Sequence, residues 1–448
     1  MGTAERSRAI VLGASMAGLL AACVLADAYD EVVVVDRDEL RDDDLPRKGV
    51  PQGNHVHALL ARGRHIIEEL LPGITDELVA TGAVTGDVTG NVRWVMEGRR
   101  MPQPHSDMLL LSMSRPHLEQ RVRTRVRALP NVSFLHRHDI TGLLTSDDRR
   151  TVVGVSVVED GRSRELAADL VVDATGRRSR TPAWLVELGF PEVEEVEQRI
   201  GVGYATQYFR LPPESMGDDI SIDVVATPET GRGAICARIE GGRTVVTAYG
   251  FLGDYPPHDS EGFLAFLKSL SGTDIYDTVK DHEPLGDPVA YRFPANLRRR
   301  YELMTSFPAG LLVLGDAVCS FNPVYGQGMT VAALGAMVLR DHVSRPGVPR
   351  AEEYFAELAE GAVDAVWSMT TGADLAFPGV EGERTEEWRQ EQSYVGQLLE
   401  AATRDHSLLT AYARVVFLVD PPEALVAPEI QSAVRAASPD TPLAAEPH

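Results

Sequence analysis

The stretch 311–334, LLVLGDAVCSFNPVYGQGMTVAAL, holds residues whose types and spacing suit the binding of a polar ligand. An apolar run leads to Asp316, and a glycine-rich loop then leads into a helix of small residues. Glycines let the backbone approach a ligand closely, and N–H groups at a helix start are free to bind a phosphate or a carbonyl. The residues expected to face the ligand are Gly315, Asp316, Pro323, Gly326, Gly328 and Met329.

A second ligand-binding pattern lies near the N-terminus. The turn GASMAG (13–18) separates the apolar runs 9–12 and 32–35, which predict two buried parallel strands, and Asp36 ends the second run. This pattern is typical of a βαβ dinucleotide-binding unit, in which the pyrophosphate rests on the helix N-terminus and a carboxylate binds the ribose. The middle glycine is replaced by Ser15, which must tolerate the phosphates or bond to them. The predicted contacts are Gly13, Ser15, Met16, Ala17, Gly18, Asp36 and Arg37. An apolar βαβ unit that binds no nucleotide is the alternative.

The basic loop 46–63 contains His55, His57 and Arg62. A His-x-His pair can bind a metal, but no cysteine or carboxylate cluster completes the set. We therefore favour a loop that lies beside the phosphates of the ligand and expect Arg62 to contact them. An ordinary solvated loop is the alternative.

Two further segments bring polar residues toward the same ligand. Ser114 is expected to cap a helix over 114–129, and Arg115 at its start could reach a phosphate. The turn at Thr175 and Gly176 could lie across the ligand. The remaining arginines of the helix are expected on a solvated face, namely Arg121, Arg123, Arg125 and Arg127.

The composition is that of an acidic globular protein. Its 448 residues are too many for one small core, so two or three subdomains are expected. A formal net charge of −23 argues against nucleic-acid binding. The three cysteines lie far apart, which predicts neither a disulfide framework nor a zinc site and fits a reducing cytoplasm. The uncharged run 9–26 resembles a signal peptide, but its glycine spacing and the strand after it favour a cytoplasmic protein without stable membrane insertion.

The order of apolar runs and turns predicts an α/β fold with inserted antiparallel strands. Short alternating runs between 132 and 172, VSFL (132–135) among them, predict a small antiparallel sheet. The predicted regions are a nucleotide-binding domain (1–75, 104–185 and 286–345), a β-sheet substrate domain (76–103 and 186–285), a helical region (346–436) and a disordered tail (437–448).

Three landmarks together, GASMAG with Asp36, DATGRRSR (173–180) and GDAVCSFNPVYGQGMT (315–330), resemble the FAD-dependent monooxygenases of the aromatic hydroxylase and squalene epoxidase superfamily. The resemblance covers residues 8–345. It implies a Rossmann-type, glutathione-reductase-like FAD-binding domain with an inserted β-sheet substrate domain. It further implies that Asp36 holds the adenosine ribose, Asp316 the ribityl or pyrophosphate side and Arg115 the FAD phosphates, with the Pro323–Met329 loop along the isoalloxazine.

The stretches PRKGVPQGNHVHALL (46–60) and YRFPAN (291–296) are most similar to bacterial epoxidases of natural-product alkenes. The resemblance implies an epoxidase or hydroxylase that acts through a flavin C4a-hydroperoxide on a hydrophobic polyketide or terpenoid intermediate. Such an oxidant requires that water be excluded, and backbone N–H groups near Gly326 to Gly328 could stabilise developing negative charge. The side-chain candidates for catalysis are Tyr325, Gln327, His57 and His55.

One departure concerns the source of electrons. Self-reducing aromatic hydroxylases carry Ala-Asp-Gly where this chain has Ala174-Thr175-Gly176, and that Asp is associated in the family with NADPH use. We therefore expect NAD(P)H to bind weakly, or electrons to arrive through a separate flavin or ferredoxin reductase. Two other functions remain open: an FAD-dependent reductase or dehydrogenase of an alkene, and a non-catalytic carrier with a flavoprotein fold.

Overall fold

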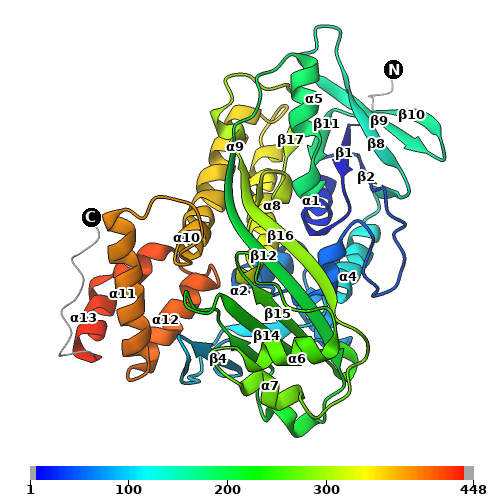
Figure 1. Ribbon diagram of the computed structural model, residues 1–448. Helices are drawn as coiled ribbons and strands as arrows, with labels where there is room; N and C mark the ends of the chain where they lie inside the picture. Colours follow the sequence, from blue (N-terminus) through cyan, green and yellow to red (C-terminus); the bar gives the residue numbers. More distant parts are fainter. Residues whose placement is uncertain (1–6, 438–448) are drawn as a thin grey trace.

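A computed structural model describes residues 7–437 and shows an α/β fold whose strands form four sheets within this range (Figure 1). The first sheet is parallel throughout. Its strands, in spatial order, are β17 (Leu311–Val313), β11 (Leu170–Asp173), β1 (Arg8–Leu12), β2 (Glu31–Val35) and β7 (Val132–Leu135). The inner strands are continuous apolar runs because both faces of the sheet are buried. Their carboxyl ends lead to the predicted ligand residues, which therefore meet at one edge.

VSFL (132–135) was expected in the small antiparallel sheet, and this prediction is wrong. The segment forms β7, which pairs in parallel with β2 at the edge of the five-stranded sheet. The residue pattern of a strand does not show whether it joins the antiparallel sheet or the edge of the parallel sheet, because one face of the strand is half buried in either position. The antiparallel sheet consists of β8 (Asp139–Thr145), β9 (Val152–Glu159) and β10 (Arg162–Ala167).

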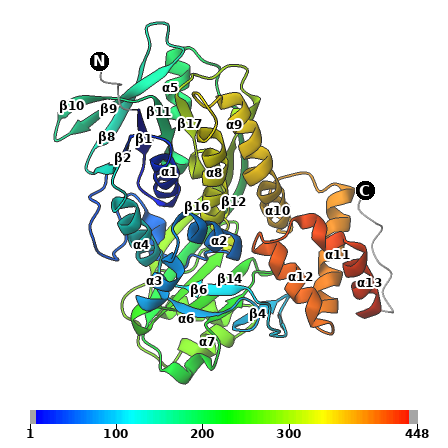
Figure 2. The same cartoon turned by 180° about the vertical axis from the view of Figure 1, so that it is seen from behind.

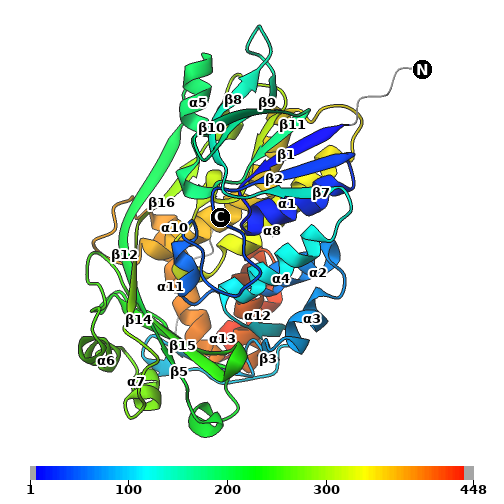
Figure 3. The ribbon, with the colours of Figure 1, turned by 90° about the vertical axis from the view of Figure 1, so that its right-hand side faces the viewer.

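Helices pack on the parallel sheet, and two of them, α1 (Met16–Ala26) and α8 (Gly328–Val343), begin at residues predicted to bind the ligand. The helices α1 and α8 contact each other along their length below β1 and β2 (Figure 3). Small residues also let α8 pack closely on the end of β17, as at Gly335, where a Cβ would lie 2.5 Å from the Leu314 side chain. The neighbouring helices are α2 (Ala61–Leu70), α3 (Ile74–Ala80), α4 (Arg115–Arg127), α5 (Thr181–Leu188) and α9 (Ala351–Leu358).

An eight-stranded sheet forms the second layer. Its strands, in order, are β18 (Cys319–Ser320), β16 (Val289–Arg299), β12 (Glu195–Phe209), β15 (Arg243–Gly250), β14 (Arg232–Ile239), β13 (Ser221–Val224), β4 (Val92–Met96) and β5 (Arg99–Arg100). The helices α6 (Ser260–Lys268) and α7 (Asp274–Val279) cover one face through an apolar cluster that includes Phe263 and Leu267. A short antiparallel pair, β3 (Val84–Asp87) with β6 (Leu109–Ser112), lies beside this layer.

The long strands β12 and β16 connect the two layers and run down the middle of the molecule (Figure 1). Residues 286–345 were assigned to the nucleotide-binding domain, yet β16 and β18 within this range pair into the eight-stranded sheet. Alternating apolar positions in β16 do not reveal which sheet it joins. One of the inserted strands, which were expected to be antiparallel, also differs, because β4 pairs in parallel with β13.

The C-terminal region is helical, with α10 (Asp364–Asp374), α11 (Glu386–Ala402), α12 (His406–Val416) and α13 (Pro428–Ala437). Figure 2 shows α11–α13 as a group beside β4, away from the five-stranded sheet. This group buries Leu398 and Leu408 in its own core. The predicted tail lies outside the described residues, except for Ala437, which ends α13. No helix in residues 7–437 is long and apolar enough to cross a membrane.

Candidate functional site

The turn between β1 and α1 requires its glycines. Gly13 has a φ of +97°, and a Cβ on Gly18 would lie only 1.8 Å from the carbonyl oxygen of Gly13. The helix begins at Met16 behind Ser15, whose side chain does not cap it, and no acidic residue lies in the first turn. The N–H groups of the first turn of α1 are therefore available to an anion, as in other dinucleotide-binding folds.

Asp36 lies at the end of β2 with its carboxylate fixed toward this turn. It accepts hydrogen bonds from the Ala14 N–H at 2.6 Å and the Asp38 N–H at 2.8 Å, and it is 8% exposed. The Arg47 guanidinium lies 3.4 Å away. The predicted ribose-binding carboxylate is thus close to the predicted phosphate-binding turn.

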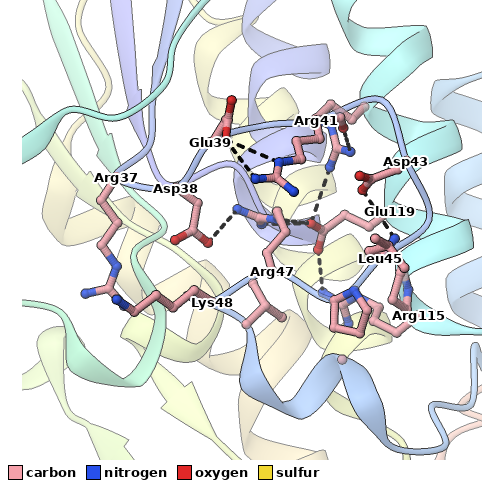
Figure 4. Close-up of a pocket in the computed structure, with 15 residues that line it drawn as sticks. Arg37, Asp38, Glu39, Arg41, Asp43, Leu45, Arg47, Lys48, Arg115 and Glu119 are labelled. Carbon is pink, nitrogen blue, oxygen red and sulfur yellow. Dashed lines mark hydrogen bonds and ion pairs between the residues drawn. The ribbon is translucent and has the colours of Figure 1, made fainter.

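A cavity of about 370 Å³ opens beside this strand end, between the loop 37–53 and α4 (Figure 4). Ligand pockets typically have volumes of this order. Arg47, Lys48 and Gly53 of the basic loop 46–63 line it together with Arg37 and Arg115. The basic loop predicted to lie beside the ligand therefore forms much of the wall.

Glu119 of α4 links the two sides of the cavity. Its carboxylate accepts a hydrogen bond from the Arg47 side chain at 2.8 Å and from the Ser15 hydroxyl at 2.9 Å. Arg115 in turn donates to the Ser15 hydroxyl at 2.9 Å. Burial opposes the ionisation of Glu119, but the guanidinium groups of Arg47 and Arg115 outweigh it and lower the pKa of Glu119. Glu119 thereby holds both arginines at the start of α1.

One expectation for α4 is wrong. Arg123 was placed on a solvated face, but it is only 3% exposed. Its guanidinium lies 3.6 Å from Glu119 and donates to the Arg41 carbonyl oxygen at 2.7 Å. The loop that contains Arg41 covers this side of the helix, and the helical pattern gives no sign of such a cover. The expected N-cap is present, since the Ser114 hydroxyl accepts from the His117 N–H.

The turn after β11 folds around Asp173. This buried carboxylate accepts hydrogen bonds from the Thr175 N–H at 2.9 Å and the Thr175 hydroxyl at 2.6 Å. The hydroxyls of Ser179 and Thr181 bond to its other oxygen. The side chain of Thr175 is therefore directed into its own turn, which is what positions Gly176.

Gly176 and Asp316 are neighbours at the same edge. A Cβ on Gly176, which has a φ of +80°, would lie 3.9 Å from the Asp316 Cβ, and one on Gly328 would lie 3.9 Å from the Asp316 Oδ1. Burial raises the pKa of Asp316, while the positive charges of Arg115 and Arg177 oppose the rise. The structure therefore brings together the three predicted segments that start at Gly13, Thr175 and Gly315.

The loop 323–328 lies against the basic loop. A Cβ on Gly326, which has a φ of +67°, would lie 2.9 Å from the Ala58 Cβ. The Gly326 N–H already donates to the Pro323 carbonyl at 3.0 Å, so it is not available to a ligand, contrary to the expectation for this donor. The helix α8 begins at Gly328, and the Gln327 side chain does not cap it. The donors available on this loop are consequently those of the first turn of α8.

Comparison with known proteins agrees with this geometry. The FAD binding domain family matches residues 6–343, and protein Rv3254 of Mycobacterium tuberculosis is 34% identical over 93% of this chain and 90% of its own. The chain belongs to the FAD-dependent monooxygenase superfamily. A kynurenine 3-monooxygenase of Salinispora tropica is 26% identical over 75% of this chain and 72% of its own. The crystal structure of p-nitrophenol 4-monooxygenase from Pseudomonas putida shares the fold, with a TM-score of 0.64 and 16% identity over 92% of this chain and 98% of that one.

The residues of this superfamily member fit an FAD. The Nε of Arg115 is buried and has no partner among the described residues, and the first turn of α1 has no cap. Both are donors that a pyrophosphate can accept from. Asp36 and Asp316 supply carboxylates on either side of them for hydroxyl groups of the cofactor. Arg62, by contrast, lies on the exposed face of α2. Its backbone N–H donates a hydrogen bond to the Phe417 carbonyl oxygen at 3.4 Å.

Two of the proposed catalytic side chains of this flavoprotein are bonded to α10. The Tyr325 hydroxyl donates to Asp374 at 2.8 Å, and the Gln327 amide oxygen accepts from the Thr370 hydroxyl at 2.7 Å. Burial raises the pKa of Tyr325 well above its usual value. Both side chains therefore tie the 323–328 loop to the C-terminal helices.

His57 lies close to Arg115. Burial and the charge of Arg115 lower the pKa of His57 to about 3, so that it is neutral at pH 7. Its Nδ1 is 3.0 Å from the His55 carbonyl oxygen and therefore carries the proton. Within residues 7–437, no group of three or more His, Cys, Asp or Glu is arranged to hold a metal.

Sequence reasoning missed the residues that position the others. Arg47, Glu119, Asp173 and Asp374 each have several polar partners; Arg47 and Asp173 lie within quoted stretches without having been singled out, and Glu119 and Asp374 belong to no recognised motif. The combination of Arg115 and Glu119 one helical turn apart could have indicated a buried pair. Asp374 ends α10, 44 residues beyond the end of the motif GDAVCSFNPVYGQGMT (315–330), where the sequence carries no such signal.

Proposed function

We propose that this protein is an FAD-dependent monooxygenase that places one oxygen atom of O₂ on a hydrophobic polyketide or terpenoid intermediate, by epoxidation or hydroxylation. The observation that carries the proposal is an aromatic face of the eight-stranded sheet beside the 323–328 loop. Tyr204, Tyr249 and Tyr291 are partners in one row across β12, β15 and β16. Their side chains therefore share the face opposite the cluster under α6 and α7.

This aromatic face is close to the cofactor residues. The Tyr204 hydroxyl lies 3.4 Å from the Asn322 side chain, directly before the loop, and burial and the negative charge of Asp316 raise the pKa of Tyr291. Phe251 and Phe377 stack at 3.9 Å and extend the apolar surface. A substrate between the loop and this face would meet rings and few charges, which favours an apolar molecule with an alkene or an electron-rich ring.

The protein residues supply binding, orientation and exclusion of water. Bound FAD supplies the redox chemistry, namely acceptance of electrons from NAD(P)H or a reductase and activation of O₂. Arg115 and the start of α1 hold the phosphates, while Asp36 and Asp316 hold hydroxyls on each side. The aromatic face excludes water from the reacting centre. Because Thr175 occupies the position of the NADPH-associated Asp, we infer that a separate reductase delivers the electrons.

The test measures oxygen transfer directly. The FAD-loaded protein is supplied with a flavin reductase, NADPH and ¹⁸O₂, and a panel of alkenes, phenols and prenylated rings is analysed by mass spectrometry. One ¹⁸O atom per product molecule is expected. Equal turnover without O₂ would instead identify a reductase, and a protein that purifies without flavin and cannot be reconstituted would identify a carrier.

A further inference from the structure

His55 lies between the eight-stranded sheet and the loop 323–328. It is 7% exposed, and its ring centroid is 5.9 Å from that of Tyr204 and 5.6 Å from that of Tyr291. Ala58, three residues further on, contacts Gly326. The imidazole therefore lies on the aromatic face, in the region where the proposed substrate would bind.

A chain of hydrogen bonds fixes which nitrogen of His55 carries the proton. The Val56 N–H donates to the Thr247 hydroxyl oxygen at 3.0 Å. The hydroxyls of Thr247 and Thr206 lie 2.6 Å apart, as cross-strand partners on β15 and β12, and the Thr206 hydroxyl lies 2.7 Å from the His55 Nδ1. The Thr247 and Thr206 hydrogens both find acceptors only if Thr247 donates to Thr206 and Thr206 donates to Nδ1, which leaves the hydrogen on Nε2 for an acceptor outside the chain. The opposite direction would leave the buried Thr247 hydrogen unpaired.

His55 therefore carries its proton on Nε2. This nitrogen is buried and has no partner among the described residues. Burial lowers the pKa of His55 to about 4, so the ring is neutral at pH 7 and has one N–H to donate. A buried donor without a partner destabilises the protein. A buried, unpaired donor on the aromatic face is typical of a group whose hydrogen-bond acceptor is supplied by a bound ligand.

We propose that the Nε2–H of His55 recognises an acceptor oxygen on the substrate, a carbonyl or phenolic oxygen beside the group that is oxidised. The proposal rests on the proposed function, which places the substrate between the aromatic face and the loop. Thr206 and Thr247 are positioning residues, because they act on the substrate only through His55. The site thereby selects oxygenated intermediates over plain hydrocarbons of the same shape.

The experiment compares two molecules of nearly equal shape. Benzophenone carries a carbonyl where 1,1-diphenylethylene carries a methylidene group, and their binding to the FAD-loaded protein is measured by equilibrium dialysis. We expect benzophenone to bind at least about tenfold more tightly, since one lost hydrogen bond of about 1.4 kcal/mol corresponds to tenfold. His55→Phe should abolish the difference, and His55→Gln, whose amide N–H replaces Nε2–H, should restore part of it.

Equal binding of the two compounds, failure of benzophenone to bind, or an unchanged preference in His55→Phe would overturn the proposal. A second measurement needs no ligand. Nitrogen-15 NMR of histidine-labelled protein should show His55 protonated at Nε2 in the wild type and in Thr206→Ser, with loss of the fixed tautomer in Thr206→Val. A proton on Nδ1 in the wild type would also overturn it. Neither measurement depends on turnover, so a protein that transfers no ¹⁸O but passes both would contradict the proposed function alone.

Discussion

The hydroxyl of Tyr325 donates a 2.8 Å hydrogen bond to Asp374, which lies 49 residues further along the chain at the end of α10. The same carboxylate accepts from the side-chain amides of Asn296 at 2.7 Å and Asn322 at 2.8 Å, and it is fully buried. The Asp374 side chain thus joins Asn296 of β16 to Asn322 and Tyr325, which lie at the two ends of the turn that begins the 323–328 loop. The conformation of the loop depends on a helix that the motif does not include.

The first prediction concerns the pH dependence of stability. Burial raises the pKa of Asp374 from the usual 3.8 to about 6. The folded protein therefore retains this proton at pH values where the unfolded chain has lost it, so the stabilisation is complete below about pH 4 and is lost as the pH rises through 6. Two pH units correspond to about 3 kcal/mol. Urea unfolding of Asp374→Asn between pH 4 and 8 should show a smaller fall in the free energy of unfolding than the wild type.

A matched control is available on β13. Burial raises the pKa of Asp223 to about 7, so the stabilisation by this carboxyl is lost over the wider range from about pH 4 to pH 7. Between pH 6 and 7 the fall should therefore persist in Asp374→Asn and be lost in Asp223→Asn. If the two variants have identical pH profiles, the assignment to Asp374 is wrong.

Most of the parallel sheet and the cofactor edge could be predicted from the sequence. Gly13, Asp36 and Asp316 follow apolar runs, and such runs in parallel sheets place their carboxyl ends at one edge. The fold class and the family were predicted on the same residues, and both are confirmed. These features are local, because a strand, a turn and a helix start are encoded within a few residues.

The long-range partners could not be predicted in this way. Nothing in the residues around Glu119 shows that the loop at Arg47 covers it, and nothing around Asp374 shows that it meets Tyr325. The parallel pairing of β7 was missed for the same reason, since an isolated strand does not specify its partner. Local patterns predicted which residues face the ligand, while tertiary contacts decide which side chains hold them in place.

The second prediction concerns the turn that is expected to hold the phosphates. Gly18→Ala places a Cβ 1.8 Å from the Gly13 carbonyl, a clash that only a shift of α1 can relieve. We expect the purified variant to lack most of its FAD absorbance, or to fail to fold. Gly396→Ala, in the middle of α11 with no atom within 4 Å of the new Cβ, should retain FAD and stabilise by up to about 1 kcal/mol. A Gly18→Ala protein with full FAD content would contradict the proposed site.

The third prediction tests the role of Arg115. Lysine retains the charge but loses the guanidinium fork, whose N–H groups reach both Ser15 and the expected phosphates. Arg115→Lys should therefore weaken FAD binding to the apoprotein about 10- to 100-fold, as measured by flavin fluorescence. Arg123→Lys is the matched control, because it also faces Glu119 but has its other bond to the Arg41 carbonyl. Equal loss of affinity in both variants would show that Arg115 acts only through Glu119.

The last prediction concerns the Ala-Thr-Gly turn. Thr175→Asp would restore the residue that the self-reducing hydroxylases carry, but the Thr175 hydroxyl lies 2.6 Å from the buried Asp173 carboxylate. A second carboxylate at this position would face the first one, so we expect the free energy of unfolding to fall by at least about 2 kcal/mol. Thr175→Ser keeps the hydroxyl and should be as stable as the wild type. Stopped-flow reduction of the bound flavin by NADPH should not be faster in Thr175→Asp. A stable variant whose flavin is reduced more rapidly would show instead that this turn accepts the NADPH-associated carboxylate and that position 175 alone limits direct reduction.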